Sequence, residues 1–182
     1  PMYGPFLEGE VPLGRLPDVI DAPITTAIGT TRADLASWLR IFRAAYYNTE
    51  TVSVRPEDVD PLLAAVQAGD SLFITAAYEQ MPLGAARVAL HLPTAELVSV
   101  AVAPFWHSMG LEIALITTAV RAALELGSSI IFTIAPPEEY MPLYRRLGFI
   151  ELANLLNFWQ AEEYARRVLE SPEVITNEGA QP

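Results

Sequence analysis

The feature that most constrains the fold is a change of pattern in the middle of the chain. Upstream of residue 104, three strand-like segments follow one another with only short turns between them: Ser71–Tyr78, Gly84–Leu92 and Glu96–Ala103. Strands joined this closely pair antiparallel, because a parallel connection needs about a dozen residues or more. Downstream, a long helix expected over Met109–Leu126 leads to the nearly all-apolar segment Ser129–Ala135. Such a strand is typical of a parallel pair covered by helices, so the sequence predicts an α/β fold with a mixed sheet.

Two helices are predicted before the antiparallel strands. Thr31 can cap the first helix, whose apolar residues recur at spacings of three and four along one face: Leu35, Trp38, Leu39, Phe42 and Tyr46. The second helix is expected to begin near Pro56 and to end at Gly69, because proline is favoured in a first turn and glycine just past the last. The short apolar segment Ile24–Ile28 precedes both helices and is predicted to be the first strand.

Three further elements are predicted after the parallel pair. They are a short helix over residues 142–147, an extended segment over 149–159 and a closing helix over 161–170. The order β-α-α-β-β-β-α-β-α-β predicts one domain, a mixed sheet of six to seven strands flanked by helices. We expect this domain to span residues 24–170, with a proline- and glycine-rich arm at 1–23 and a polar tail at 171–182.

Composition excludes several classes of function. Eleven basic and 22 acidic residues give a net charge of −11. Neither nucleic-acid binding nor membrane binding is expected, because both rely on basic surfaces. The chain has no cysteine and only two isolated histidines, so no metal site is expected. No run approaches about 18 apolar residues and no basic segment precedes an apolar run, so a cytoplasmic protein is expected.

The most promising ligand site lies where the third antiparallel strand gives way to the long helix. In open α/β sheets, ligands bind beyond the carboxyl end of a parallel strand, at the start of the following helix. In this chain that place is the segment from Val102 to Gly110. Free N–H groups and the helix dipole favour an anion there, and glycine allows it to approach the backbone closely.

Three segments at and beyond this place resemble the GCN5-related N-acetyltransferase (GNAT) superfamily. They read Val100-Ala101-Val102-Ala103-Pro104, His107-Ser108-Met109-Gly110-Leu111-Glu112 and Leu143-Tyr144-Arg145-Arg146-Leu147-Gly148-Phe149. In that family a V-x-V-x-P strand end precedes an Arg/Gln-x-x-Gly-x-Gly/Ala loop, and a Tyr-x-x-Leu-Gly-Phe string follows. The resemblance covers roughly residues 24–160, and the element order predicted above is the order of the family.

This resemblance implies a GNAT-like fold and an activity. The expected activity is N-acyltransfer, most simply N-acetyltransfer, from acetyl-CoA or another acyl-CoA to an amine of a small molecule or peptide. A homodimer is left open.

The resemblance also implies roles for individual residues. The backbone of Val100, Ala101 and Val102 would bind the pantetheine arm and the thioester carbonyl. The pyrophosphate would rest on the backbone N–H groups of the loop, whose residues are His107, Ser108, Met109, Gly110, Leu111 and Glu112. Tyr144 would protonate the departing thiolate as general acid. Glu96, chosen over Glu79 because it is close to Val100 in the chain, would deprotonate the amine.

Three departures from the family pattern keep other functions open. His107 stands where Arg or Gln is usual, Glu112 where Gly or Ala is usual, and Pro137 where many members have Asn. A carboxylate in the first helical turn competes with a phosphate for the same N–H groups. One alternative is therefore a donor without pyrophosphate, such as acyl carrier protein, although an acidic carrier would be repelled by a net charge of −11. The other is a catalytically inactive module that binds a ligand or regulates a partner.

The candidate residues also have purely structural interpretations. Tyr144 can pack under the last strand, Glu112 can be a first-turn acid that faces water, and Glu96 can be a solvated residue at the start of a strand.

Overall fold

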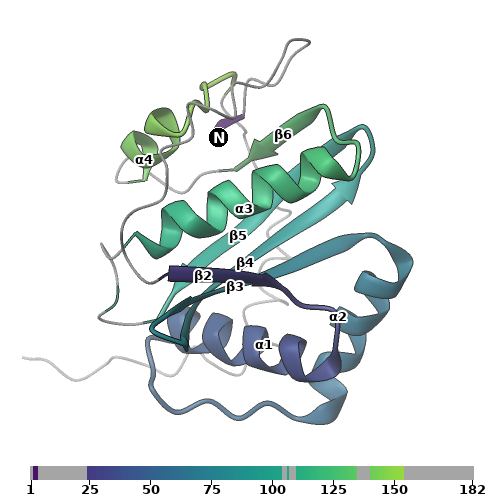
Figure 1. The fold of residues 1–182 in the computed structure, drawn as a ribbon, viewed down its shortest axis with the longest axis vertical. Helices are drawn as coiled ribbons and strands as arrows, with labels where there is room; N and C mark the ends of the chain where they lie inside the picture. Colours follow the sequence, from purple (N-terminus) through teal and green to yellow (C-terminus); the bar gives the residue numbers. More distant parts are fainter. Residues whose placement is uncertain (1, 4–23, 104–105, 107–109, 135–139, 154–182) are drawn as a thin grey trace, which may run out of the picture.

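The computed structural model describes residues 2–3, 24–103, 106, 110–134 and 140–153 of the chain. Its centre is a six-stranded sheet with the order β1-β6-β5-β4-β3-β2 (Figure 1). The strands are β1 (Met2–Tyr3), β2 (Ile24–Ile28), β3 (Ser71–Tyr78), β4 (Met81–His91), β5 (Thr94–Val102) and β6 (Ile130–Thr133). The helices are α1 (Arg32–Tyr46), α2 (Pro56–Ala68), α3 (Leu111–Glu125) and α4 (Met141–Arg146).

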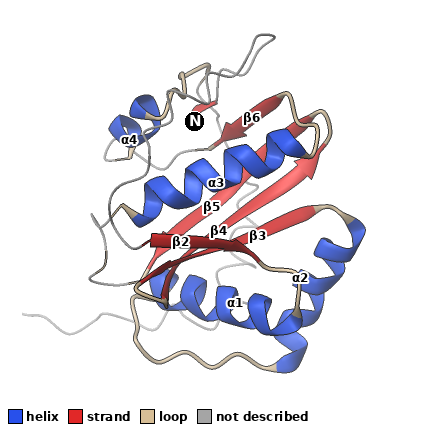
Figure 2. Ribbon diagram, in the orientation of Figure 1, coloured by secondary structure: helices blue, strands red, loops and turns tan. Residues whose placement is uncertain are grey.

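The sheet is mixed, as the sequence predicts. Strands β2 to β5 pair antiparallel in succession, and β5 pairs parallel with β6, which lies beyond the helical connection through α3. Helix α3 covers one face of the sheet, and α1 and α2 cover the other (Figure 2). The central strands β3 and β4 therefore present apolar side chains to two helical layers.

Strand alternation divides the core into two clusters. Ile74 and Ala86 belong to the cluster under α3, whereas their chain neighbours Phe73 and Ala85 belong to the cluster under α1 and α2. Successive side chains of a strand point to opposite faces, so both faces of β3 and β4 are apolar and buried. This is why these central strands carry almost no charge.

The predicted ends of the first two helices are confirmed. The Thr31 hydroxyl accepts from the backbone N–H of Asp34 at 3.3 Å, and the backbone N–H of Thr31 donates to the Asp34 carboxylate at 3.0 Å. This reciprocal pair satisfies two N–H groups that the helix itself leaves without a partner. Gly69 ends α2 with a φ of 75°, which glycine adopts without steric cost.

The predicted count of six to seven full strands is not confirmed. Five strands have four residues or more, and β1 adds only two residues from the predicted arm, paired with the outer edge of β6. The expected strand over 149–159 is absent from its described part, where Ile150 makes only an isolated bridge. Phe149 is buried against the Tyr144 ring, so its apolar character serves packing on α4. Residues 154–159 and the expected helix over 161–170 lie outside the described residues.

Candidate active site

Strands β5 and β6 separate part of the way along their length. Their parallel pairing comprises Thr94 with Ile130, Ala95 with Ile131, and Glu96 with Phe132. Strand β5 continues to Val102 and stays paired with β4 on its other edge. Between Leu97 and Val102, the edge of β5 that faces β6 therefore has no strand partner among the described residues, although the Leu97 carbonyl oxygen accepts a hydrogen bond from the Thr133 side chain. The stretch beyond Leu97 is left open to a ligand.

A β-bulge lies at the start of this open stretch. Leu97 pairs with Val88 and Ser99 pairs with Arg87, so Val98 has no partner in β4. The extra residue shifts the side-chain alternation by one position. As a result Leu97 and Val102 both join the core cluster under α3, although they are five positions apart and would lie on opposite faces of a regular strand.

A cavity of about 590 Å³ occupies the gap between the separating strands. Since α1 and α3 lie on opposite faces of the sheet and both contribute to its wall, the cavity extends through the sheet. Its walls come from α1 (Phe42, Ala45, Tyr46), β5 (Leu97 to Val102), α3 (Glu112, Ile116), β6 and the next residue (Thr133, Ile134), and α4 with its N-cap (Tyr140, Leu143, Tyr144).

Tyr144 lies where the two strands part. Its side chain is 6% exposed and its ring packs edge-on against Phe149, with the centroids 5.3 Å apart. Its hydroxyl forms a hydrogen bond with the Thr133 side chain, and the Thr133 hydroxyl donates to the Leu97 carbonyl oxygen at 2.8 Å. Burial raises the pKa of Tyr144, and the bond with Thr133 offsets part of that rise. The phenol is therefore protonated at neutral pH, and it is fixed to both separating strands.

The start of α3 lies at the same cavity. Gly110 is the N-cap, with a φ of 85° that favours glycine, and it offers no side chain to cap the first N–H groups of the helix. Leu111 is fully buried in the core, whereas Glu112 lines the cavity. The predicted helix start at Met109 is moved to Leu111, because Gly110 has a left-handed backbone conformation.

Several of the predicted site residues are thus brought together. Val100, Ala101, Val102, Glu112 and Tyr144 all line one cavity although they come from three elements. His107, Ser108, Met109 and Pro137 lie outside the described residues.

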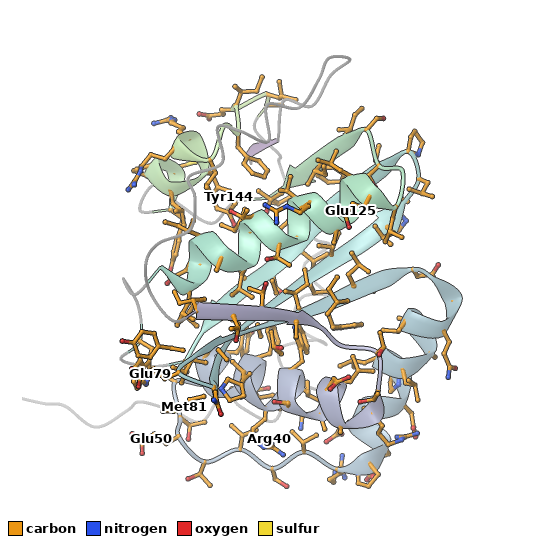
Figure 3. All side chains as sticks on the ribbon, viewed as in Figure 1. Arg40, Glu50, Glu79, Met81, Glu125 and Tyr144 are labelled. Carbon is orange, nitrogen blue, oxygen red and sulfur yellow. The ribbon has the colours of Figure 1, made fainter. Side chains whose placement is uncertain are left out.

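Neither Glu96, the carboxylate predicted as the base, nor Glu79, the alternative to it, lines the cavity. Glu96 belongs to the part of β5 that is paired on both edges, opposite Ala89 and Phe132. Glu79 lies in the turn between β3 and β4, well apart from Tyr144 (Figure 3). The carboxylate that lines the cavity, among the described residues, is Glu112.

Sequence reasoning missed Thr133, Tyr140 and Tyr46. Thr133 had a signal, because it is the one hydroxyl in the apolar run Ile130–Thr133. Tyr46 was predicted to lie on the buried face of α1, yet it is 72% exposed at the cavity. It is the last residue of the helix.

Within the part of the chain that the structure describes, no cluster of histidine and acidic side chains could hold a metal ion. None of the described helices has the length and apolarity needed to cross a membrane.

Comparison with solved structures shows which fold this is. An acetyltransferase from Trypanosoma brucei superimposes with a TM-score of 0.61 at 16% identity, covering 75% of this chain and 99% of that one. An aminoglycoside N-acetyltransferase in complex with CoA gives a TM-score of 0.62 at 14% identity, covering 78% and 97%. Glucosamine-6-phosphate N-acetyltransferase from Arabidopsis thaliana gives 0.59 at 14%, covering 74% and 98%. At these identities the likeness establishes the fold alone.

No curated protein sequence matches the chain significantly. The family model described as "Acetyltransferase (GNAT) family" matches residues 35–149, which is more than half of the chain and includes both the open stretch of β5 and Tyr144. The chain therefore belongs to the GNAT family of acetyltransferases.

Proposed function

We propose that this protein transfers an acetyl group from acetyl-CoA to a primary amine of a small molecule or peptide. The observation that carries the proposal is the Tyr144 hydroxyl, held protonated beside the unpaired edge of β5 in a cavity of about 590 Å³. An open strand edge can hydrogen-bond an amide-containing arm as a further strand would, and the phenol supplies a proton beside it.

The residues present fit acetyl-CoA as a substrate. The pantetheine arm carries amide groups, which suit the backbone of Val100, Ala101 and Val102. The start of α3 suits the pyrophosphate, because its first N–H groups have no side-chain cap and the helix dipole favours an anion. The aminoglycoside acetyltransferase with the same fold has been solved with CoA, which supports this assignment.

In the proposed reaction, the amine nitrogen attacks the thioester carbonyl carbon. A C–N bond forms, the C–S bond breaks, and the thiolate takes the proton of the Tyr144 hydroxyl. The amine loses its proton to water, after which the tyrosinate is reprotonated from solvent. Open backbone N–H groups of β5 would stabilise the oxyanion, and positioning of the two substrates supplies the remaining rate. The hydrogen bond with Thr133 holds the phenol oxygen beside β5.

Glu112 favours a second candidate donor, an acyl carrier protein, whose arm ends without the nucleotide pyrophosphate. The carboxylate lines the cavity near the place proposed for the pyrophosphate. Among the described residues, the basic pair that could dock an acidic carrier is Arg145 and Arg146 on α4, and Arg145 already interacts with Glu151 at 3.4 Å. The sequence holds a second pair, Arg166 and Arg167, outside the described residues. Acetyl-CoA is therefore the preferred donor.

The test is titration of the protein with acetyl-CoA by calorimetry, followed by an assay of thiol release in the presence of amines. Because the chain contains no cysteine, a thiol reagent reports only free CoA. We expect saturable binding and amine-dependent thiol release. Absence of binding up to about millimolar acetyl-CoA, a standard free energy weaker than about −4 kcal/mol, would overturn the proposal. Activity with acyl carrier protein alone would favour the second donor.

A further inference from the structure

Large apolar side chains that are exposed to solvent converge on the cavity mouth. Four of them line the cavity and come from different parts of the fold: Tyr46 (72% exposed), Ile134 (46%), Val98 (43%) and Tyr140 (39%). We call these four side chains the apolar rim. Exposed apolar surface gathered around a cavity is typical of a site that binds an apolar group.

Tyr46 is held in place although it is exposed. The rings of Trp38 and Phe42 lie 5.1 Å apart at 8°, and those of Phe42 and Tyr46 lie 6.0 Å apart at 21°. The Trp38 indole N–H donates to the Ala86 carbonyl oxygen at 2.8 Å, which anchors the row of rings to the sheet. Tyr47 packs edge-on against Tyr46 at 5.0 Å. Because the ring is already held in one place, a ligand that stacks on it loses little binding free energy to ordering the side chain.

The β-bulge in β5 places the Val98 side chain at the cavity. Val98 is the residue of β5 without a partner in β4, and its side chain is 43% exposed instead of being packed in either core cluster. Tyr46 on α1 and Val98 on β5 therefore give the cavity two apolar walls from different elements.

An acetyl group is too small to contact side chains that come from α1, β5 and the N-cap of α4 at the same time. The polar end of acetyl-CoA has its own proposed place at the start of α3, so the apolar rim is left for the second substrate. We propose that the apolar rim binds an aromatic ring of the acceptor, and that the acceptor is a primary amine carried on an aryl-alkyl body. This inference rests on the proposed acetyltransfer and names its substrate class.

The test compares 2-phenylethylamine with ethylamine, which has the same amino-ethyl group without the ring. We expect kcat/KM for 2-phenylethylamine to exceed that for ethylamine by between about tenfold and a hundredfold, from burial of the ring. Tyr46→Ala should reduce this ratio about tenfold, mainly through KM, whereas Tyr46→Phe keeps it. The matched control is Leu92→Ala, since Leu92 is a large exposed side chain in the turn between β4 and β5 and does not line the cavity.

Equal kcat/KM values for the two amines, or a ratio that survives Tyr46→Ala, would overturn the inference. A third arm compares acetyl-CoA with octanoyl-CoA. If Tyr46→Ala lowers the preference for the longer acyl chain and leaves the amine ratio unchanged, the rim binds the acyl chain and the inference is wrong.

Direct binding separates this inference from the proposed function. Saturation-transfer NMR with 2-phenylethylamine, without acetyl-CoA, should show binding to the parent and Leu92→Ala proteins and weaker binding to Tyr46→Ala. If the amine binds in this pattern but no acetyl group is transferred, the proposed function fails while the rim stands as an aromatic-amine site. If amines are acetylated without preference for the ring, the rim inference alone fails.

Discussion

From Thr94 to Glu96, β5 is paired on both edges, with β4 and with β6, whereas from Leu97 to Val102 it is paired with β4 alone. The first part uses its backbone hydrogen bonds to hold the sheet together. The second part leaves one edge without a strand partner and places Val100 to Val102 along the cavity. One strand thus combines a stretch that holds the sheet together with a stretch proposed to bind a substrate, and the bulge at Val98 lies where the first gives way to the second.

The largest expected effect is a loss of activity at the unpaired part of β5, residues 97–102, which we call the open half of the strand. Tyr144→Phe removes the proposed proton donor but keeps the ring that packs against Phe149. We expect kcat to fall by a factor of about 10² to 10⁴, with little change in acetyl-CoA affinity, measured by steady-state kinetics and calorimetry. Tyr47→Phe, outside the cavity, is the control. An unchanged kcat would mean that Tyr144 packs without donating a proton.

The same tyrosine predicts a dependence of stability on pH. Burial raises the pKa of Tyr144 above its value in the unfolded chain, about 10. Its contribution to stability is therefore complete below about pH 10 and is lost as the pH rises through the folded-state pKa. Urea unfolding at pH 9 and pH 11 should show a smaller alkaline loss for Tyr144→Phe than for the parent protein.

In the closed half of β5, residues 94–96, we expect substitutions of the packed pairing partners to lower the stability of the fold. Ile131 pairs with Ala95 and is 1% exposed, so Ile131→Ala should lower the free energy of unfolding by about 2–5 kcal/mol. Val98→Ala, at the exposed bulge, should change it by no more than about 0.5 kcal/mol. If urea titrations show the same loss of unfolding free energy for both variants, the two halves of β5 do not differ in their contribution to stability.

Thr133 of β6 joins β5 to Tyr144, and its substitution is expected to have a smaller effect on stability than that of Ile131. Thr133→Val leaves the Leu97 carbonyl oxygen and the Tyr144 hydroxyl without their hydrogen bonds, at a cost of about 1–3 kcal/mol in stability. We expect kcat to fall as well, because the phenol loses the group that orients it, and Thr133→Ser should restore both quantities. If Thr133→Val lowers stability but leaves kcat unchanged, Thr133 joins the strands without positioning the phenol.

The smallest effect is expected at Glu112. If pyrophosphate binds at the start of α3, Glu112→Gln removes a nearby like charge and should tighten acetyl-CoA binding about fivefold to tenfold at low salt. The gain should shrink as salt rises. Glu125→Gln, at the other end of the same helix (Figure 3), is the matched control. If the Glu112 variant binds acetyl-CoA with unchanged affinity, the pyrophosphate does not bind at the start of α3.

Features with local chemical signals could be predicted from the sequence. The bounds of β2 and β3 and the caps at Thr31 and Gly69 follow from apolar patterning and cap residues, and all are confirmed. The predicted start of β4, at Gly84, was wrong. The turn before it consists of Glu79 and Gln80, both with positive φ, and neither is a residue that predicts such a tight turn. Strand β4 therefore begins at Met81 and not at Gly84.

The site was harder to predict because it depends on contacts between distant segments. A bulge at Val98 changes one register position and leaves no mark in composition. Glu96 is close to Val100 in the chain, but pairing on both edges of β5 ends between them, so only Val100 lines the cavity. The bond between Thr133 and Tyr144 joins two elements whose relative placement no local pattern specifies.

Gly84 lies outside the cavity but behind one of its walls. This residue of β4 pairs with Val102 of β5, and a Cβ added to it would lie 2.9 Å from Leu115 Cδ1 and 3.3 Å from Ala76 Cβ. A side chain at position 84 would therefore crowd Leu115 on α3, the helix whose residues Glu112 and Ile116 form one wall of the cavity. The packing behind that wall thus depends on a glycine of β4 that lies outside the cavity itself. We expect a larger residue at position 84 to disturb this wall without altering any side chain that lines the cavity.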